Sequence, residues 1–156
     1  MLAGDVSVEL IDGILRVLGD REANSIVIEQ TGLESGKFRI LGVAGTTVNG
    51  QSEMVFNGVA GLSSVTGWGD DSVTVRNCLD AVDMRVRLGA GNDSLEILDG
   101  AAGRVRIVAG AGDDLVTIDT VDAKRFGIRA GRGDDRVEAD ASGHVVVRLG
   151  DRKSVV

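Results

Sequence analysis

The sequence is poor in the residues that fill ordinary globular cores and shape their loops. Its 156 residues include no proline, no tyrosine, one tryptophan and three phenylalanines. So few aromatic side chains would be unusual in a compact globule, where aromatic residues supply much of the buried surface. A narrow core filled by valine, isoleucine, leucine and alanine tolerates this deficit, and such a core is typical of a solenoid.

Other absences limit the classes of function. The single Cys78 cannot form an intrachain disulfide, and the single His144 has no cysteine or second histidine near it in the sequence repeat described below. This argues against a zinc or histidine-based catalytic site. Residues 1–20 show no cleavable signal peptide, and no apolar run approaches the length of a membrane span. The net charge of −7 argues against nucleic acid as a partner.

The sequence is instead rich in glycine, and a glycine-containing motif, G-x-G-[DN]-D-x-[VL], occurs four times. The leading glycines are 22, 21 and 21 residues apart. The glycines and the two polar residues of each copy are Gly67, Gly69, Asp70 and Asp71; Gly89, Gly91, Asn92 and Asp93; Gly110, Gly112, Asp113 and Asp114; and Gly131, Gly133, Asp134 and Asp135. Self-similarity at a fixed period is typical of stacked supersecondary units.

Strict apolar alternation surrounds each motif. Val73 and Val75 flank Thr74 after the first motif, and Met84, Val86 and Leu88 alternate with arginines before the second. Period two with one apolar face predicts half-buried strands, and each repeat therefore contains two strands and two turns. The sequence predicts an all-β fold, a right-handed parallel β-solenoid with two strands and about 21 residues per coil.

We expect a single domain over residues 1–156, whose parts differ in how closely they match the repeat. Residues 1–11 are predicted to cap the stack, 12–66 to form degenerate coils, 67–149 to form four regular coils, and 150–156 to begin an incomplete coil. Asn24 occupies the place that Asp93 has in a regular coil. An uncovered final coil exposes unpaired backbone groups, so we expect self-association through residues 145–156 or continuation into a longer solenoid.

Stacking would turn the repeated motif into a column of acidic side chains at one edge. Equivalent turns lie about 4.8 Å apart in a parallel stack, and the carboxylates would repel one another unless something offsets their charge. Calcium suits such a column because it takes six to eight oxygen ligands in flexible geometry. The competing explanation is an Asx turn, in which each side chain hydrogen-bonds its own backbone.

The four motifs resemble the calcium-binding nonapeptide of the repeats-in-toxin family, G-G-x-G-x-D-x-U-x. The match covers the second glycine, the third glycine, the aspartate and the apolar position of each copy. The family's first glycine is replaced here by Thr66, Leu88, Ala109 and Ala130. The family also places a nonapeptide at both edges of its coil, whereas this chain has the motif at one edge.

The resemblance implies one column of up to three calcium ions. The ligands would be the second acids, Asp71, Asp93, Asp114 and Asp135, together with carbonyls of the glycine loops. The residues before them, Asp70, Asn92, Asp113 and Asp134, would be partial ligands or would contact the ligands without touching the ion. Because such sites saturate at millimolar calcium, the resemblance also implies an extracellular or cell-surface protein.

The function that these features favour is a non-enzymatic calcium-binding module with a structural or adhesive role. Catalytic carboxylate pairs need two different environments, and a repeating column supplies equivalent ones. One alternative is a metal-free solenoid that assembles end to end into a scaffold or filament. A second is an accessory domain that binds an acidic polysaccharide.

The second alternative depends on a basic strand face. Its arginines are Arg85, Arg87, Arg106, Arg129 and Arg148, flanked by Arg104 and Arg125. Guanidinium groups bind carboxylates and phosphates through paired hydrogen bonds. The opposing explanation is a solvated sheet face whose charges discourage aggregation between sheets.

Overall fold

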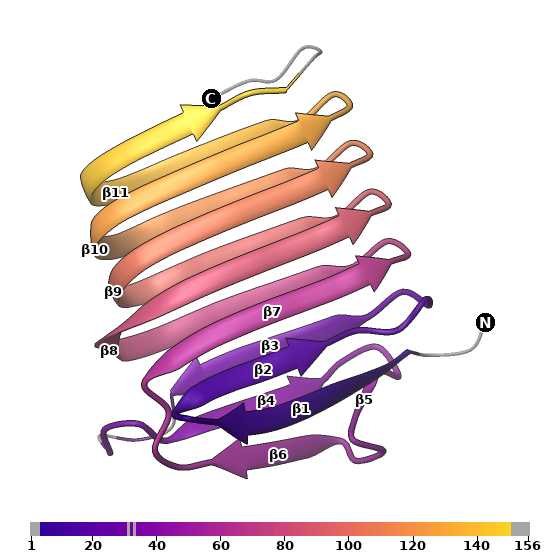
Figure 1. Cartoon of the computed structure of the whole chain (residues 1–156), viewed down its shortest axis with the longest axis vertical. Coiled ribbons are helices and arrows are strands. Elements are labelled where there is room, and N and C mark those ends of the chain that lie inside the picture. The colour runs from indigo at the N-terminus through magenta and orange to yellow at the C-terminus, as the bar shows by residue number, and fades with distance from the viewer. Residues whose placement is uncertain (1–3, 31, 33, 151–156) are drawn as a thin grey trace.

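The computed structural model describes residues 4–30, 32 and 34–150, which form strands and turns with no helix (Figure 1). No helix long and apolar enough to cross a membrane is therefore present in these residues. The strands are β1 (Asp5–Ile11), β2 (Ile14–Leu18), β3 (Ser25–Gln30), β4 (Phe38–Gly42), β5 (Thr47–Val48), β6 (Glu53–Phe56), β7 (Gly61–Trp68), β8 (Ser72–Ala90), β9 (Ser94–Ala111), β10 (Leu115–Arg132) and β11 (Arg136–Arg148).

Strands β7 to β11 form a regular stack of parallel coils. Each of β8, β9 and β10 contains both straight runs of one coil and the bend between them, and the glycine turns protrude along one edge of the stack (Figure 1). The register joins equivalent positions of the repeat, since Val73 pairs with Leu95 and Leu95 with Val116. The predicted β-solenoid with coils about 21 residues apart is therefore confirmed.

The two walls of the stack enclose a thin aliphatic core. Along β8 to β10 the predicted inward columns are buried, including Met84, Val86, Ile107 and Phe126, while the residues between them are exposed or half-buried. This is the alternation expected of strands with one buried face and one solvent-exposed face. Burial of these side chains from every coil in one continuous core provides the main hydrophobic stabilisation of the stack.

One further coil lies on the N-terminal side of the regular stack. Strand β2 pairs in parallel with β7, and β3 pairs in parallel with β8, where Ser25 lies beside Ser72. Asn24 therefore stands directly before the strand, at the place that the second acid of the motif has in later coils. Strand β1, where a cap was expected over residues 1–11, pairs antiparallel with β2 and parallel with β5 at this end of the stack; residues 1–3 lie outside the described part.

The expectation that residues 12–66 consist of degenerate coils needs correction for residues 38–56. Here β4 pairs antiparallel with β3, and β6 pairs antiparallel with β4, so this segment forms a meander instead of another coil. Apolar alternation has the same period in parallel and antiparallel strands, and the pattern in the sequence could not distinguish them. A short connection between β3 and β4 permits only the antiparallel return.

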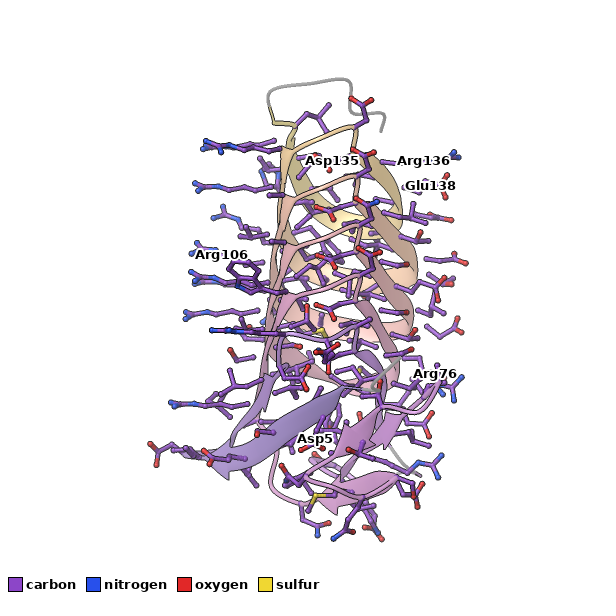
Figure 2. All side chains as sticks on the ribbon, turned by 90° about the vertical axis from the view of Figure 1, so that its right-hand side faces the viewer. Asp5, Arg76, Arg106, Asp135, Arg136 and Glu138 are labelled. Atoms are coloured by element: carbon purple, nitrogen blue, oxygen red, sulfur yellow. The ribbon has the colours of Figure 1, made fainter. Side chains whose placement is uncertain are left out.

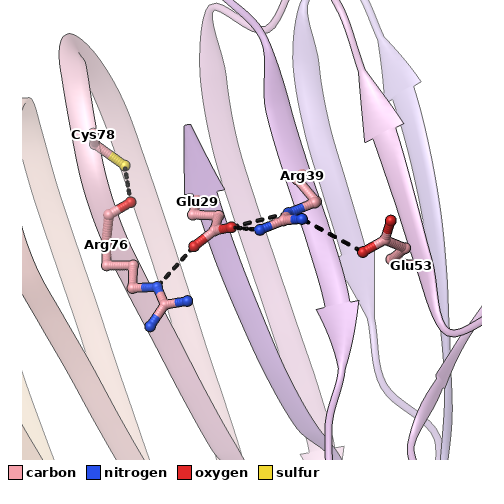
Figure 3. Close-up of polar contacts among 5 residues, drawn as sticks. All are labelled: Glu29, Arg39, Glu53, Arg76 and Cys78. Atoms are coloured by element: carbon pink, nitrogen blue, oxygen red, sulfur yellow. Dashed lines mark hydrogen bonds and ion pairs between the residues drawn. The ribbon is translucent and has the colours of Figure 1, made fainter. Parts of the chain in front are cut away.

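A buried carboxylate joins this meander to the coils (Figure 3). Glu29 on β3 is 6% exposed and accepts hydrogen bonds from Arg39 on β4 and from Arg76 on β8, the latter at 2.7 Å. Burial raises the pKa of Glu29, but the hydrogen bonds from Arg39 and Arg76 outweigh this effect and hold the pKa below its usual value. The ion pairs thus connect three strands across the change from antiparallel to parallel pairing.

Strand β11 is the last strand in the sheet order, and β10 is its one strand neighbour among the described residues. Its inward column is more exposed than in earlier coils, with Val145 at 36% and Leu149 at 40%. An incomplete final coil was predicted over residues 150–156, and residues 151–156 lie outside the described part of the chain. Self-association through residues 145–156 therefore stays a prediction.

Candidate functional site

The glycine turns bring the backbones of successive coils unusually close together. The amide of Gly91 donates to the carbonyl of Ala111 in the next coil at 2.9 Å, and the equivalent bond from Gly112 to Arg132 is 2.8 Å. A Cβ atom on Gly91 would lie 2.6 Å from the carbonyl carbon of Gly69 in the previous coil. Glycine is needed here because a side chain would collide with a neighbouring backbone.

The second acids of the four motifs form a buried column, here called the inner ladder (Asp71, Asp93, Asp114 and Asp135). Each side chain is 2% exposed. Each Oδ1 accepts the backbone amide of the coil before it: Asn24 N–H to Asp71 at 2.7 Å, Asp71 N–H to Asp93 at 2.8 Å, Asp93 N–H to Asp114 at 3.0 Å, and Asp114 N–H to Asp135 at 3.2 Å. The inner ladder therefore satisfies one backbone donor in every turn.

The first polar residues form a parallel but exposed column, here called the outer ladder (Asp70, Asn92, Asp113 and Asp134). Its hydrogen bonds run in the opposite direction, because each Oδ1 accepts the amide of the following coil. Asn92 N–H donates to Asp70 at 2.8 Å, and Asp113 N–H donates to Asn92 at 2.9 Å. An amide oxygen serves this purpose as well as a carboxylate, which explains why asparagine is accepted at position 92.

These contacts differ from the Asx turn considered above. In both ladders the side chain accepts from the backbone of a neighbouring coil and not from its own turn. The two residues are 21 or 22 positions apart in the sequence, except that Asn24 and Asp71 are 47 apart. A single turn viewed in isolation gives no hint of such a contact. The acids hold successive coils in register, which is a structural role that the sequence analysis did not predict.

The inner ladder leaves one oxygen of every carboxylate without a partner. Oδ2 of Asp71, Asp93, Asp114 and Asp135 is buried and has no hydrogen-bond partner among the described residues. A buried acceptor without a partner costs about 1–3 kcal/mol, and more when it is charged. Two unit charges about 5 Å apart repel by about 3 kcal/mol at an effective dielectric constant of about 20. The column is therefore under electrostatic stress when all four carboxylates are ionised.

The pKa values of three of these carboxylates reflect this stress. Burial raises the pKa of Asp114 to about 7, with a further contribution from the neighbouring carboxylates of Asp93 and Asp135. Burial likewise raises the pKa of Asp93 to about 6, and it raises the pKa of Asp71. Binding of a proton or a cation would lower the electrostatic energy of the column, because it offsets negative charge and gives the unpaired Oδ2 atoms a partner.

Stability without divalent cations is expected to fall as pH rises from about 4 to about 7. The pKa values of Asp93 and Asp114 lie above the ordinary value of 3.8. The folded chain thus binds more protons than the unfolded chain between about pH 4 and pH 7, and its free energy of unfolding decreases across that window. One pKa unit corresponds to about 1.4 kcal/mol. Thermal unfolding in chelator at several pH values measures the effect, and a melting temperature that rises with pH would contradict it.

The inner ladder offers a cation oxygen ligands from two successive coils at a time. No cluster of three or more carboxylate, histidine or cysteine side chains suited to a metal occurs within residues 4–30, 32 and 34–150. Any ion would therefore take its remaining ligands from backbone carbonyls or water, as calcium does readily. The buried Oδ2 atoms without partners are the oxygens of the inner ladder that such an ion would use, whereas the outer ladder is exposed to solvent.

The arginines of the predicted basic surface also lie together. Arg85, Arg87, Arg104, Arg106, Arg125, Arg129 and Arg148, here called the arginine face, are exposed on the second straight runs of β8 to β11. Figure 2 shows Arg106 in a row of side chains that projects from one wall, with Arg136 and Glu138 on the opposite wall and Asp135 at the edge between them. The acid ladders and the arginine face are thus separate surfaces.

Comparisons with protein-family models, with curated proteins and with solved structures found no match to this chain. The resemblance to the repeats-in-toxin motif therefore rests on the motif residues alone. One departure from that motif has a structural reason. Thr66, Leu88, Ala109 and Ala130, which replace the family's first glycine, are fully buried and fill the core.

Proposed function

We propose that this chain is a non-enzymatic calcium-binding β-solenoid module with a structural or adhesive role. The observation that supports the proposal is the row of buried, unpaired Oδ2 atoms on Asp71, Asp93, Asp114 and Asp135. Calcium between successive coils would offset the charge of the column and use the oxygens that the backbone amides leave free.

Up to three ions are proposed, one between each pair of consecutive inner-ladder residues. Each ion would take Oδ2 from two coils, and carbonyl oxygens of the glycine turns or water would complete its coordination. Sites with few charged ligands bind calcium weakly and fill where calcium is about millimolar. This supports placing the protein outside the cell or on its surface.

The repeating environment also supports a non-enzymatic role. Every inner-ladder carboxylate is equally buried and accepts the same kind of amide bond. General acid and base catalysis by a carboxylate pair depends on environments that separate two pKa values within one site, and the ladder continues unchanged across several coils.

A metal-free scaffold is the second candidate. The raised pKa of Asp114, at about 7, allows a proton to take the place of a cation near neutral pH. The exposed inward column of β11 favours contact between copies at that end. In this candidate the inner ladder only aligns the coils, and stability does not depend on calcium.

Calcium is expected to raise the melting temperature, and a chelator to lower it without complete loss of β structure. At free calcium about 100 times the dissociation constant, each independent site contributes about 2.7 kcal/mol, or roughly 5–10 °C for a chain of this size. Circular dichroism melts in calcium, in chelator and in magnesium measure the effect, and magnesium should be much weaker because it demands near-octahedral geometry.

The same experiment separates the two candidates. An identical melting temperature in millimolar calcium and in excess chelator would overturn the calcium proposal. If, in addition, the solution mass in chelator rises with protein concentration, the metal-free scaffold becomes the better description. A chain that stays monomeric and whose melting temperature rises with calcium would support the calcium-binding module and not the scaffold.

A further inference from the structure

The arginine face carries charges that no ion pair among the described residues neutralises. The ion pairs of the described residues involve Lys37, Arg39, Arg76 and Arg136, and none includes an arginine of this face. The chain nevertheless has a net charge of −7. A protein with an excess of carboxylates has thus gathered seven guanidinium groups on one wall, away from the two acid ladders, with Asp83 as the carboxylate that lines a hollow beside them.

The stacking register arranges these arginines in columns along the solenoid axis. Arg85 pairs with Arg106, Arg104 with Arg125, and Arg129 with Arg148. Neighbouring members of a column lie on strands about 4.8 Å apart. Like charges this close repel one another, so the arrangement favours an anionic ligand that spans several coils.

A hollow lies among these arginines where their columns are interrupted. Gly127, Val108 and Val146 occupy outward positions at which a coil has no arginine, and they form the floor of a groove of about 480 Å³. Its rim is made by Arg87, Arg106, Arg125, Arg129, Arg148 and His144. A second hollow of about 210 Å³ adjoins it, shares Arg106, Arg125 and Gly127, and includes Asp83.

Gly127 is the residue that keeps this floor open. It is not among the glycines with positive φ, and a Cβ atom added to it would meet nothing within 4 Å. The backbone therefore does not require glycine at this position, unlike at Gly91. A larger side chain at position 127 would stand in the groove between Arg106 on β9 and the adjacent arginines.

We propose that the arginine face is a binding site for a linear acidic polysaccharide that lies along the solenoid axis across β8 to β11. Guanidinium groups bind carboxylates and sulfates with paired, charge-assisted hydrogen bonds. A chain of sugars with regularly spaced acidic groups matches arginines that recur at each coil. The shallow groove accepts the rings, while the rim contacts the acidic groups.

Nucleic acid fits this face less well. Single strands bind where bases stack on exposed aromatic rings, and Phe126, the one phenylalanine, tyrosine or tryptophan that lines the groove, is fully buried. The wall is a flat sheet with no element that projects into a duplex groove.

The test measures binding of two acidic probes, a heparin oligosaccharide and an oligogalacturonate, by isothermal titration calorimetry in the presence of chelator. The chelator removes calcium, which could otherwise bridge the probe to the acid ladders. We expect binding that weakens with added salt, and none to a neutral dextran of similar size. The site does not depend on the calcium proposal, because binding in chelator is independent of any ion in the inner ladder.

Two variants with the same charge change provide the matched comparison. Arg106→Glu with Arg129→Glu alters the arginine face, and Arg132→Glu with Arg136→Glu alters exposed arginines outside it. The first pair is expected to weaken binding by about tenfold or more, because at least one charge-assisted contact worth about 1.4 kcal/mol is lost, while the second pair changes affinity far less.

A third variant, Gly127→Leu, fills the groove without changing the charge and should also weaken binding, with thermal melts confirming that each variant is folded. Equal losses in the two charge-matched pairs would overturn the proposal. So would tighter binding of a single-stranded oligonucleotide than of either oligosaccharide. A free protein that dimerises through the arginine face would equally contradict it, and light scattering of the wild type and the Arg106→Glu, Arg129→Glu variant detects this.

Discussion

Replacing Gly91 by alanine is expected to cause one of the largest losses of stability that a single methyl group can produce in this chain. The φ angle of Gly91 is +141°, a region that L-amino acids rarely adopt, and the new Cβ would collide with the Gly69 carbonyl of the previous coil. Strain of the backbone and forced separation of two coils together should cost about 3–5 kcal/mol. The melting temperature should fall by roughly 10 °C or more.

Gly127→Ala is the matched control for this prediction, since it adds the same methyl group to the same stack. Position 127 has neither positive φ nor a neighbouring atom within 4 Å. Its stability should stay within about 0.5 kcal/mol of the wild type or increase slightly. Urea denaturation of both variants measures the difference. Equal effects at the two positions would show that the glycine turns are not in close contact in solution.

Replacing Asp114 by asparagine is expected to change stability in opposite directions with and without calcium. In chelator at pH 8 the substitution removes a buried charge between Asp93 and Asp135, while an amide oxygen can still accept the Asp93 N–H. Relief of this repulsion should stabilise the folded chain by about 1–3 kcal/mol. At pH 5 the gain should be smaller, because the pKa of Asp114, raised to about 7, already leaves it protonated.

In the presence of calcium the same substitution should destabilise the folded chain. Asp114 would contribute to the sites on both of its sides, so two of the three proposed ions would lose a ligand. At free calcium about 100 times the dissociation constant this lowers the stabilisation by up to about 5 kcal/mol. Thermal melts of the variant in calcium and in chelator measure the change of sign.

Asp113→Asn is the control, because Asp113 belongs to the exposed outer ladder and Asn92 already serves at the equivalent position. It should have little effect in chelator and leave most of the response to calcium intact. If Asp114→Asn destabilises the chain equally in calcium and in chelator, the inner ladder acts only through its hydrogen bonds. The metal-free scaffold would then be favoured.

The sequence alone determined the architecture of residues 67–149, where four regular coils were expected. A period of about 21 residues and strict alternation identify the strands, and because each position meets its equivalent in the next coil, the register and the core columns follow directly. For the same reason the sequence placed every second acid in one column at one edge. Residues 38–56 could not be predicted in this way, since the antiparallel return of β4 and β6 has the same apolar period as a coil.

Only the tertiary structure decided which backbone groups the acids of the repeat contact and how the arginines of successive coils are arranged. The opposite directions of the two ladders depend on which neighbouring amide each side chain reaches, and those amides are at least 21 residues away in the sequence. The unpaired Oδ2 atoms of the inner ladder follow from burial that only stacked turns create. The groove around Gly127 likewise exists because the register places Gly127 beside Val146 and next to Arg106, and places Val108 beside Arg129, a juxtaposition that no single repeat contains.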